Sequence, residues 1–244
     1  MMKRTLISAA ALLALAAGSV NAQVVVTTGA GYIKMVNALT QAYQAQTDKE
    51  VAKAVGGNIG QMLAQVAQGN GVNLVISDTG ALDKFQAHLG GDRLALGDTP
   101  LVMIWRKGLS LKSPEAIVEP DVKTVAHPDP KAAIYGRSAA KWLKNTGIGE
   151  KIKDKIRSAS SVPQVYSYVA TGNMDVGFVN LLAYRNAPEK VAGHFEIRDH
   201  GAIIHMAAQP VKGAENDADV KDFMKFLGTP KAHAIMDKFG VTMK

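Results

Sequence analysis

Two glycine-containing loops hold the residues of this sequence that are best suited to binding a ligand. The stretches TTGAG (27–31) and GGNIG (56–60) each stand between a β-rich run and a helix-like pattern. Glycine lets the backbone approach a ligand, and the first N–H groups of a helix, with the positive end of its dipole, point toward an anion. Loops at the carboxyl ends of parallel strands meet at one edge of a sheet. The two loops together therefore predict a pocket for a small anion, the alternative being glycines that serve tight turns only.

Neither loop matches a nucleotide fingerprint. After Gly29 and Gly31, a dinucleotide loop would need a third glycine at the position occupied by Lys34. GGNIG lacks the Lys-Ser/Thr pair that ends the phosphate-binding loop of NTPases. The pattern favours capture of an anion over binding of a nucleotide.

A catalytic constellation is missing from the sequence. The chain has no cysteine, which excludes disulfides, a thiol nucleophile and thiolate metal sites. The six histidines show neither HxxxH nor HxH spacing, and no G-x-S-x-G elbow occurs. His194, His200 and His205 share a β-rich region, where separate histidines are favoured over a metal site. We expect a binding protein without cofactor or metal, and not an enzyme.

The first 22 residues have the pattern of a secretory signal peptide. Lys3 and Arg4 precede an apolar run, and Val20-Asn21-Ala22 resembles a cleavage site, so cleavage is expected after Ala22. Without Lys3 and Arg4, the number of Lys and Arg residues falls from 28 to 26. Against 21 Asp and Glu residues, this gives the mature chain a formal charge of +5. The lysines are scattered and do not form the basic face of a nucleic-acid binder. The mature chain is expected to be exported to the periplasm, soluble and monomeric.

β-rich runs alternate with helical patterns along the mature chain. Expected strands cover 24–27, 51–55, 72–77, 101–105, 122–126, 176–179, 195–197 and 203–208, and the main expected helices begin near 33, 59, 132, 162, 218 and 231. This order predicts an α/β protein of two lobes, each a mixed, mostly parallel sheet flanked by helices. The first lobe is expected at 23–102 plus 206–244 and the second at 103–205. The strands at 101–105 and 203–208 are the expected hinge.

Four stretches of the chain resemble a known family. They are VVVTTGAGYIKMVNALTQAYQAQT, LAQVAQGNGVNLVISDTGALDKF, AAIYGRSAAKWL and FLGTPKAHAIMDKFGVTMK. In this order they resemble the periplasmic molybdate-binding proteins of ABC importers, which have the type II periplasmic binding-protein fold. The resemblance implies a cleft that closes on a tetrahedral oxyanion, with molybdate or tungstate favoured, and delivery to a membrane permease.

The resemblance also implies which residues bind the ligand. Carried over by position, they are Ala30, Gly31, Gly57, Asn58, Ile59, Ala132, Val162 and Asn180, and Ser161 adds a hydroxyl beside Val162. The family's hydroxyl side chains fall on Gly31, on the loop 57–59 and on Asn180, so three hydroxyl donors are replaced.

Two explanations of these replacements stay open. Either main-chain N–H groups suffice, or the ligand is another anion such as sulfate, phosphate or a small organic or phosphorylated acid. If His127 and Lys131 reached such a ligand, they would add positive charge to its site. The alternative is that both are exposed turn residues without contact to the ligand. An exported adhesin or an enzyme on the same fold is the remaining alternative.

Overall fold

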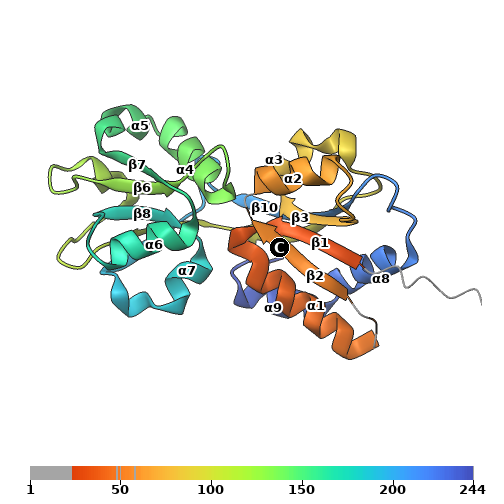
Figure 1. Cartoon of the computed structure of the whole chain (residues 1–244). Coiled ribbons are helices and arrows are strands. Elements are labelled where there is room, and N and C mark those ends of the chain that lie inside the picture. Colours follow the sequence, from red (N-terminus) through yellow and green to blue (C-terminus); the bar gives the residue numbers. More distant parts are fainter. Residues whose placement is uncertain (1–23, 48, 50, 58, 244) are drawn as a thin grey trace, which may run out of the picture.

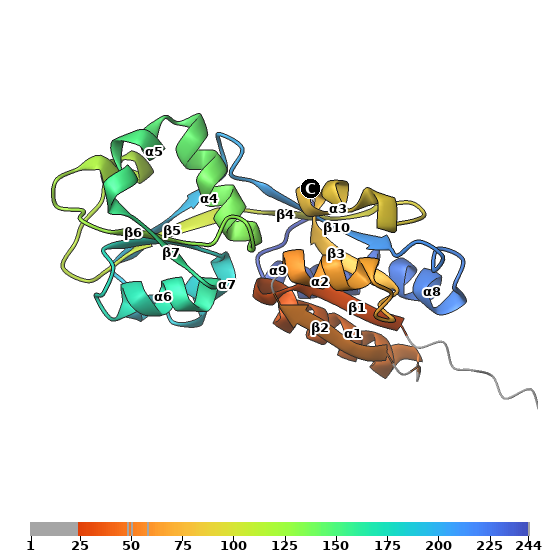
Figure 2. The ribbon, with the colours of Figure 1, turned by 45° about the horizontal axis from the view of Figure 1, so that its top comes forward.

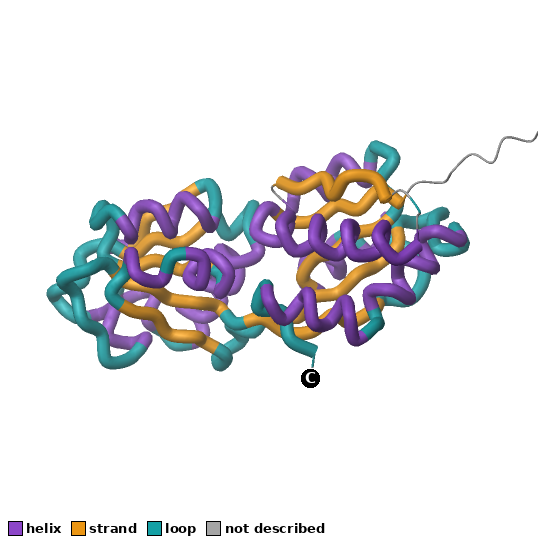
Figure 3. Tube along the Cα trace, turned by 90° about the horizontal axis from the view of Figure 1, so that it is seen from below, coloured by secondary structure: helices purple, strands orange, loops and turns teal. Residues whose placement is uncertain are grey.

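The structure is a computed structural model that describes residues 24–243 except 48, 50 and 58. The expected signal peptide and the expected ligand residue Asn58 therefore lie outside the described residues. The described residues form two α/β lobes that lie side by side (Figure 1; Figure 3). Each lobe contains one five-stranded sheet with helices on both faces.

The first lobe is built on a sheet in the order β2-β1-β3-β10-β4. Its strands are β1 (Val24–Gly29), β2 (Val51–Gly57), β3 (Leu74–Asp78), β4 (Leu94–Thr99) and β10 (Ile204–Pro210). β1 pairs with β2 and β3 in parallel, whereas β10 is antiparallel to β3 and β4. The predicted βαβαβ start thus makes the parallel half of a mixed sheet.

Helices cover both faces of this sheet because each has an apolar stripe. They are α1 (Ile33–Thr47), α2 (Ile59–Ala67), α3 (Thr79–Lys84), α8 (Ala218–Leu227) and α9 (Pro230–Lys238). α1, α8 and α9 lie on one face and α2 on the other (Figure 1). On α1, Met35, Val36 and Leu39 follow helical spacing and are fully buried. Packing of this stripe fixes the start of α1, and with it the first glycine loop.

The second lobe repeats this plan with the strand order β7-β6-β8-β5-β9. Its elements are β5 (Leu101–Trp105), β6 (Val125–Pro128), β7 (Ile156–Ala159), β8 (Val176–Val179), β9 (Gly193–Ile197), α4 (Ile134–Asn145), α5 (Ile148–Lys151), α6 (Val162–Ala170) and α7 (Leu181–Asn186). β6 is parallel to β7 and β8, and β5 is antiparallel to β8 and β9. Both lobes therefore present the carboxyl ends of their parallel strands toward the partner lobe (Figure 1).

The chain passes between the lobes through loop residues and not through shared strands. β4 ends at Thr99 and β5 begins at Leu101, so Pro100 alone makes the first crossing, and 198–203 makes the second (Figure 2). The expectation that strands 101–105 and 203–208 themselves cross between lobes is wrong. Proline has no N–H to donate to a strand ladder, so Pro100 separates β4, which pairs with β10 in the first sheet, from β5, which pairs with β8 and β9 in the second. The expected lobe limits at 102 and 206 lie close to these crossings.

Two edge strands of the structure have no counterpart in the sequence prediction. β4 and β7 have mixed polar and apolar residues, as edge strands often do, so their alternation is weak. Gly97 within β4 has φ +124°, and a Cβ atom there would lie 2.5 Å from the carbonyl oxygen of Thr242. This close approach explains a glycine inside a strand. β6 also extends to Pro128, through residues expected to form a turn.

Candidate functional site

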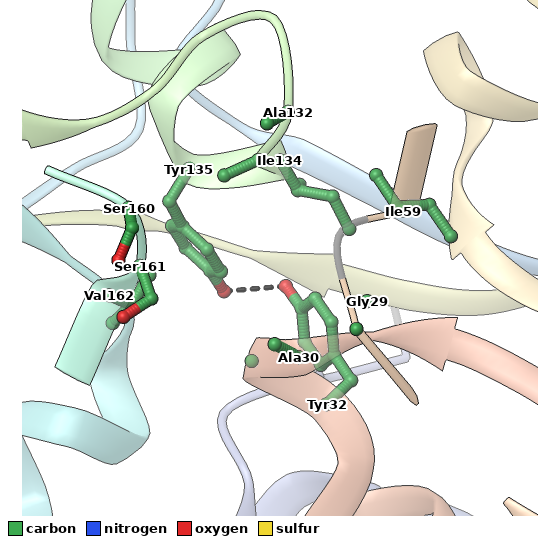
Figure 4. Close-up of a pocket in the computed structure, with 13 residues that line it drawn as sticks. Gly29, Ala30, Tyr32, Ile59, Ala132, Ile134, Tyr135, Ser160, Ser161 and Val162 are labelled. Atoms are coloured by element: carbon green, nitrogen blue, oxygen red, sulfur yellow. Dashed lines mark hydrogen bonds between the residues drawn. The ribbon is translucent and has the colours of Figure 1, made fainter. Parts of the chain in front are cut away.

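A cavity of about 180 Å³ lies between the two lobes (Figure 4). Its lining comes from the starts of four helices: Gly29, Ala30, Gly31 and Tyr32; Gly57 and Ile59; Ala132, Ala133, Ile134 and Tyr135; Ser160, Ser161 and Val162. The first two groups belong to the first lobe and the last two to the second. Each group lies at or just after the carboxyl end of a parallel strand, namely β1, β2, β6 and β7. The site thus forms where open α/β sheets bind their ligands.

The lining residues at the helix starts bring main-chain N–H groups to the edge of this cavity. Gly29 caps a 3₁₀ turn formed by Ala30–Tyr32 that leads into α1, and Ser161 caps α6. The first N–H groups of a helix have no partner within the helix, so those of Ala30, Gly31 and Val162 are available to a ligand. The N–H groups of Ala132 and Ala133 instead both donate to the Asp129 carbonyl, at 3.1 and 2.9 Å. On α4 the available N–H groups are therefore those of the first helical turn.

Neutral hydroxyl groups complete the polar lining. The phenol oxygens of Tyr32 and Tyr135 lie 2.5 Å apart and face each other across the lobes (Figure 4). Ser160 donates its hydroxyl proton to Oε1 of Gln164 at 2.8 Å. Ser161 Oγ accepts the Gln164 N–H at 3.4 Å, which leaves its own O–H free to donate. The site is therefore richer in hydroxyl groups than the loop sequences indicate.

Burial keeps both phenols protonated. Each tyrosine is only 2% exposed. Desolvation raises the pKa of Tyr32 well above its ordinary value, with a further contribution from the neighbouring Tyr135. Burial raises the pKa of Tyr135 to about 12, although hydrogen bonds with Thr99 and Tyr32 oppose the shift. At neutral pH the two phenols are therefore uncharged hydrogen-bond donors.

No charged side chain lines this cavity among the described residues. His127 is buried in β6, where its Nδ1 contacts the Pro128 carbonyl at 2.8 Å, and it does not line the cavity. Lys131 is exposed and also lies outside the lining. Among the described residues there is likewise no cluster of three or more metal-ligating side chains. An anion in this cavity would be held by neutral donors.

The structure brings seven of the nine expected ligand residues together. Those in the lining are Ala30, Gly31, Gly57, Ile59, Ala132, Ser161 and Val162. Asn58 is outside the described residues. Asn180 does not line the cavity: its Nδ2 donates to the Gly31 carbonyl at 3.3 Å and its Oδ1 caps α7 by accepting the Ala183 N–H. A ligand role for these nine residues stays a prediction.

Sequence reasoning missed Tyr32 and Tyr135 as lining residues. The available signal was position, because Tyr32 directly follows the first loop and Tyr135 lies in the stretch AAIYGRSAAKWL. Polar aromatic residues in the first turn after such a loop can point toward the ligand space.

Several polar contacts join the lobes around the cavity. Besides the tyrosine pair and the bond from Asn180, Arg137 of α4 forms an ion pair with Asp78 of β3 at 2.6 Å. Ile134 also approaches the first loop, since a Cβ atom on Gly29 would lie 3.3 Å from its Cδ1. The described structure therefore has its lobes in contact.

Gly136 sets the position of α4 over the end of β6. A Cβ atom at Gly136 would overlap the carbonyl oxygen of Pro128 and lie 2.8 Å from the carbonyl carbon of Asp129. Because these are backbone atoms, we expect Gly136→Ala to displace α4 and to lower the free energy of unfolding by about 1–3 kcal/mol. Urea denaturation measures this effect. Gly228→Ala is the control, since a Cβ atom there meets only Lys225 O at 3.4 Å. Equal losses in the two variants would contradict the prediction.

Comparison with known proteins identifies related chains along nearly the whole length. A family model described as bacterial extracellular solute-binding protein matches residues 24–242. The molybdate-binding protein ModA of Rhodobacter capsulatus is 28% identical over 237 residues, which cover 95% of this chain and 92% of the relative. ModA of Azotobacter vinelandii is 27% identical over 241 residues, with 95% and 93% covered.

Solved structures agree with this result. The periplasmic molybdate-binding protein of Azotobacter vinelandii has a TM-score of 0.78 at 25% identity, covering 91% of this chain and 100% of that chain. The predicted α/β fold of two lobes is confirmed. The relatives named here are binding proteins and not enzymes.

Proposed function

Because the chain belongs to the bacterial extracellular solute-binding proteins, we propose that it captures a small tetrahedral oxyanion for an ABC importer. Molybdate or tungstate is the preferred ligand, in line with the names of its relatives. The observation that carries the proposal is the small cavity between the lobes, lined by helix N-termini and neutral hydroxyl groups. Such a lining suits a compact anion that must be held after it has lost its water.

Neutral donors can hold a dianion when enough of them converge. A buried charge without hydrogen bonds costs several kcal/mol, whereas hydrogen bonds to a charged acceptor are worth roughly 1.5–3 kcal/mol each. The lining offers the N–H groups of Ala30 and Gly31 from the first lobe, and the Val162 N–H and the Ser161 hydroxyl from the second. The resembled family has hydroxyl side chains at positions where this chain has glycine or asparagine. The donors named above take the place of those missing hydroxyl groups. They support an oxyanion ligand despite those replacements.

The lining favours an anion without protons of its own. Molybdate, tungstate and sulfate are fully deprotonated at neutral pH, whereas phosphate keeps at least one proton there. The described lining residues include neither Asp nor Glu, so a phosphate O–H would lack a carboxylate acceptor. An unpaired buried donor costs about 1–3 kcal/mol. We therefore expect phosphate to bind at least about tenfold more weakly than molybdate.

A thermal-shift panel of anions tests the proposal. Molybdate or tungstate at 100 times its Kd adds about 2.7 kcal/mol of stability. For a chain of this size that corresponds to a rise in Tm of roughly 5–11 °C. Sulfate, phosphate and small organic or phosphorylated acids complete the panel, with chloride at matched ionic strength as the control. If molybdate and tungstate gave no shift while phosphate or an organic acid did, the assignment would be lost.

Ligand capture would act through closure of the lobes. A ligand that contacts both lobes shifts the population toward the closed form, with motion at Pro100 and at 198–203. The closed, loaded monomer is the form that we propose is presented to the permease. Export to the periplasm, with cleavage of the leader after Ala22, belongs to the same proposal. No helix in the described part of the chain has the length and apolarity needed to cross a membrane.

A further inference from the structure

Three buried hydroxyl groups form a cluster beside the cavity. Tyr135 lies between the other two, with its phenol oxygen 2.5 Å from that of Tyr32 and 3.4 Å from Oγ1 of Thr99. All three residues are at most 2% exposed. They come from separate parts of the fold. Tyr32 belongs to the first lobe, Tyr135 to α4 of the second lobe, and Thr99 is the last residue of β4 before the crossing at Pro100.

The number of protons in this cluster is larger than the number of its hydrogen bonds. Three hydroxyl groups carry three protons. Thr99 is also an electrostatic neighbour of Tyr32, but only the pairs Tyr32–Tyr135 and Tyr135–Thr99 lie within hydrogen-bond distance, so two hydrogen bonds use two of the protons. Among the described residues, none of the three hydroxyls has a hydrogen-bond partner outside the cluster. One proton at an end of the cluster therefore lacks an acceptor. In the interior such a donor is costly, so an acceptor supplied by a ligand would be favourable.

The position of the cavity determines which hydroxyl of the cluster can donate the free proton to a ligand. Tyr32 and Tyr135 line the cavity, whereas Thr99 does not. When Thr99 donates to Tyr135 and Tyr135 donates to Tyr32, the free proton is on Tyr32. An anion in the cavity can then accept it, in a charge-assisted hydrogen bond.

We infer that Tyr32 donates its phenolic proton to the bound oxyanion, with Tyr135 and Thr99 as positioning residues behind it. This inference rests on the proposed function and names a donor that the loop glycines cannot supply. Because hydrogen bonds in a chain polarise one another, the charge of the anion also strengthens the bond from Tyr135 to Tyr32. That bond joins the two lobes, so capture of the anion stabilises the closed form.

Phenylalanine substitutions test this assignment with little change of shape. Isothermal titration with molybdate compares the full mature chain with Tyr32→Phe, Tyr135→Phe and the double variant. We expect Tyr32→Phe to weaken binding at least about tenfold, since it removes a hydrogen bond to a charged acceptor. Tyr135→Phe should weaken it about threefold, because it removes only the polarising partner. The double variant should bind as Tyr32→Phe does, since Tyr135 acts through Tyr32.

Tyr43→Phe is the matched control. Tyr43 is also 2% exposed on α1, but it packs on Phe223 and Phe226, and its hydroxyl has no hydrogen-bond partner within the described part of the chain. Its loss should leave molybdate affinity unchanged.

The outcomes separate this inference from the proposed function. Wild-type affinity in Tyr32→Phe, even with a lowered Tm, would overturn the donor role and leave the proposed function intact. Independent, additive losses in the double variant would overturn the role of Tyr135. Absence of oxyanion binding by the wild-type chain would overturn the proposed function and the donor role together.

Discussion

Gly31→Val is expected to reduce molybdate affinity at least about a hundredfold. A Cβ atom at Gly31 would lie 3.3 Å from Nδ2 of Asn180 and 3.9 Å from Cε2 of Tyr135, both in the opposite lobe. The two methyl groups of valine extend beyond that atom, so they would fill the cavity or keep the lobes apart. Loss of several converging hydrogen bonds to a charged ligand accounts for about 2.7 kcal/mol or more. Titration calorimetry measures the change.

A graded series separates this effect from a general loss of fold. Gly31→Ala adds one carbon at a tight contact, and we expect a loss of affinity intermediate between wild type and Gly31→Val. Gly228→Val is the control because Gly228 is exposed at the end of α8, with φ −81°. Circular dichroism checks that each variant is folded. A folded Gly31→Val variant with full affinity would mean that the ligand binds elsewhere.

Asp175→Ala is expected to cause the largest loss of stability, about 3 kcal/mol at neutral pH. The Asp175 carboxylate accepts hydrogen bonds from Arg106 Nε at 2.6 Å and from the N–H groups of Lys123 and Thr124 at 2.7 and 2.9 Å. Its side chain is only 10% exposed. Removal leaves these donors without an acceptor just where β5, β6 and β8 meet. Tm should fall by roughly 6–12 °C.

The same carboxylate gives this loss a pH dependence. Burial opposes its ionisation, but the hydrogen bonds from Arg106, Lys123 and Thr124 outweigh burial and hold the pKa of Asp175 below its ordinary value. A lowered pKa contributes stability above the pKa of the unfolded chain, about 3.9, and that contribution disappears as pH falls through the lower folded value. The difference between wild type and Asp175→Ala should therefore be constant near pH 7 and shrink below about pH 4.

Urea denaturation between pH 7 and pH 2.5 measures this difference. Asp121→Ala serves as the control, because Asp121 is exposed and makes no hydrogen bond with another described side chain. A gap between wild type and Asp175→Ala that stayed constant down to pH 2.5 would show that the charge of Asp175 is not responsible.

Much of the fold follows from local patterns in the sequence. Buried strands such as Leu101–Trp105 are continuous apolar runs, and α1 shows its apolar stripe in the spacing of Met35, Val36 and Leu39. Helix starts are marked by local chemistry, as at Ser161 before α6 and at Thr229 before Pro230. The edge strands β4 and β7 were missed because they pack on one neighbour only and need no strong pattern.

The sequence by itself determined the two-lobe α/β architecture and the loops at which a ligand would be expected. It could do so because glycine freedom, helix capping and apolar periodicity act over a few residues. Only the tertiary structure decided that Tyr32 and Tyr135, 103 residues apart, place their hydroxyls 2.5 Å from each other. It also decided that Asn180 contacts Gly31 instead of the cavity and that Pro100 makes the crossing. Such contacts depend on how two separately packed lobes meet, which no local pattern encodes.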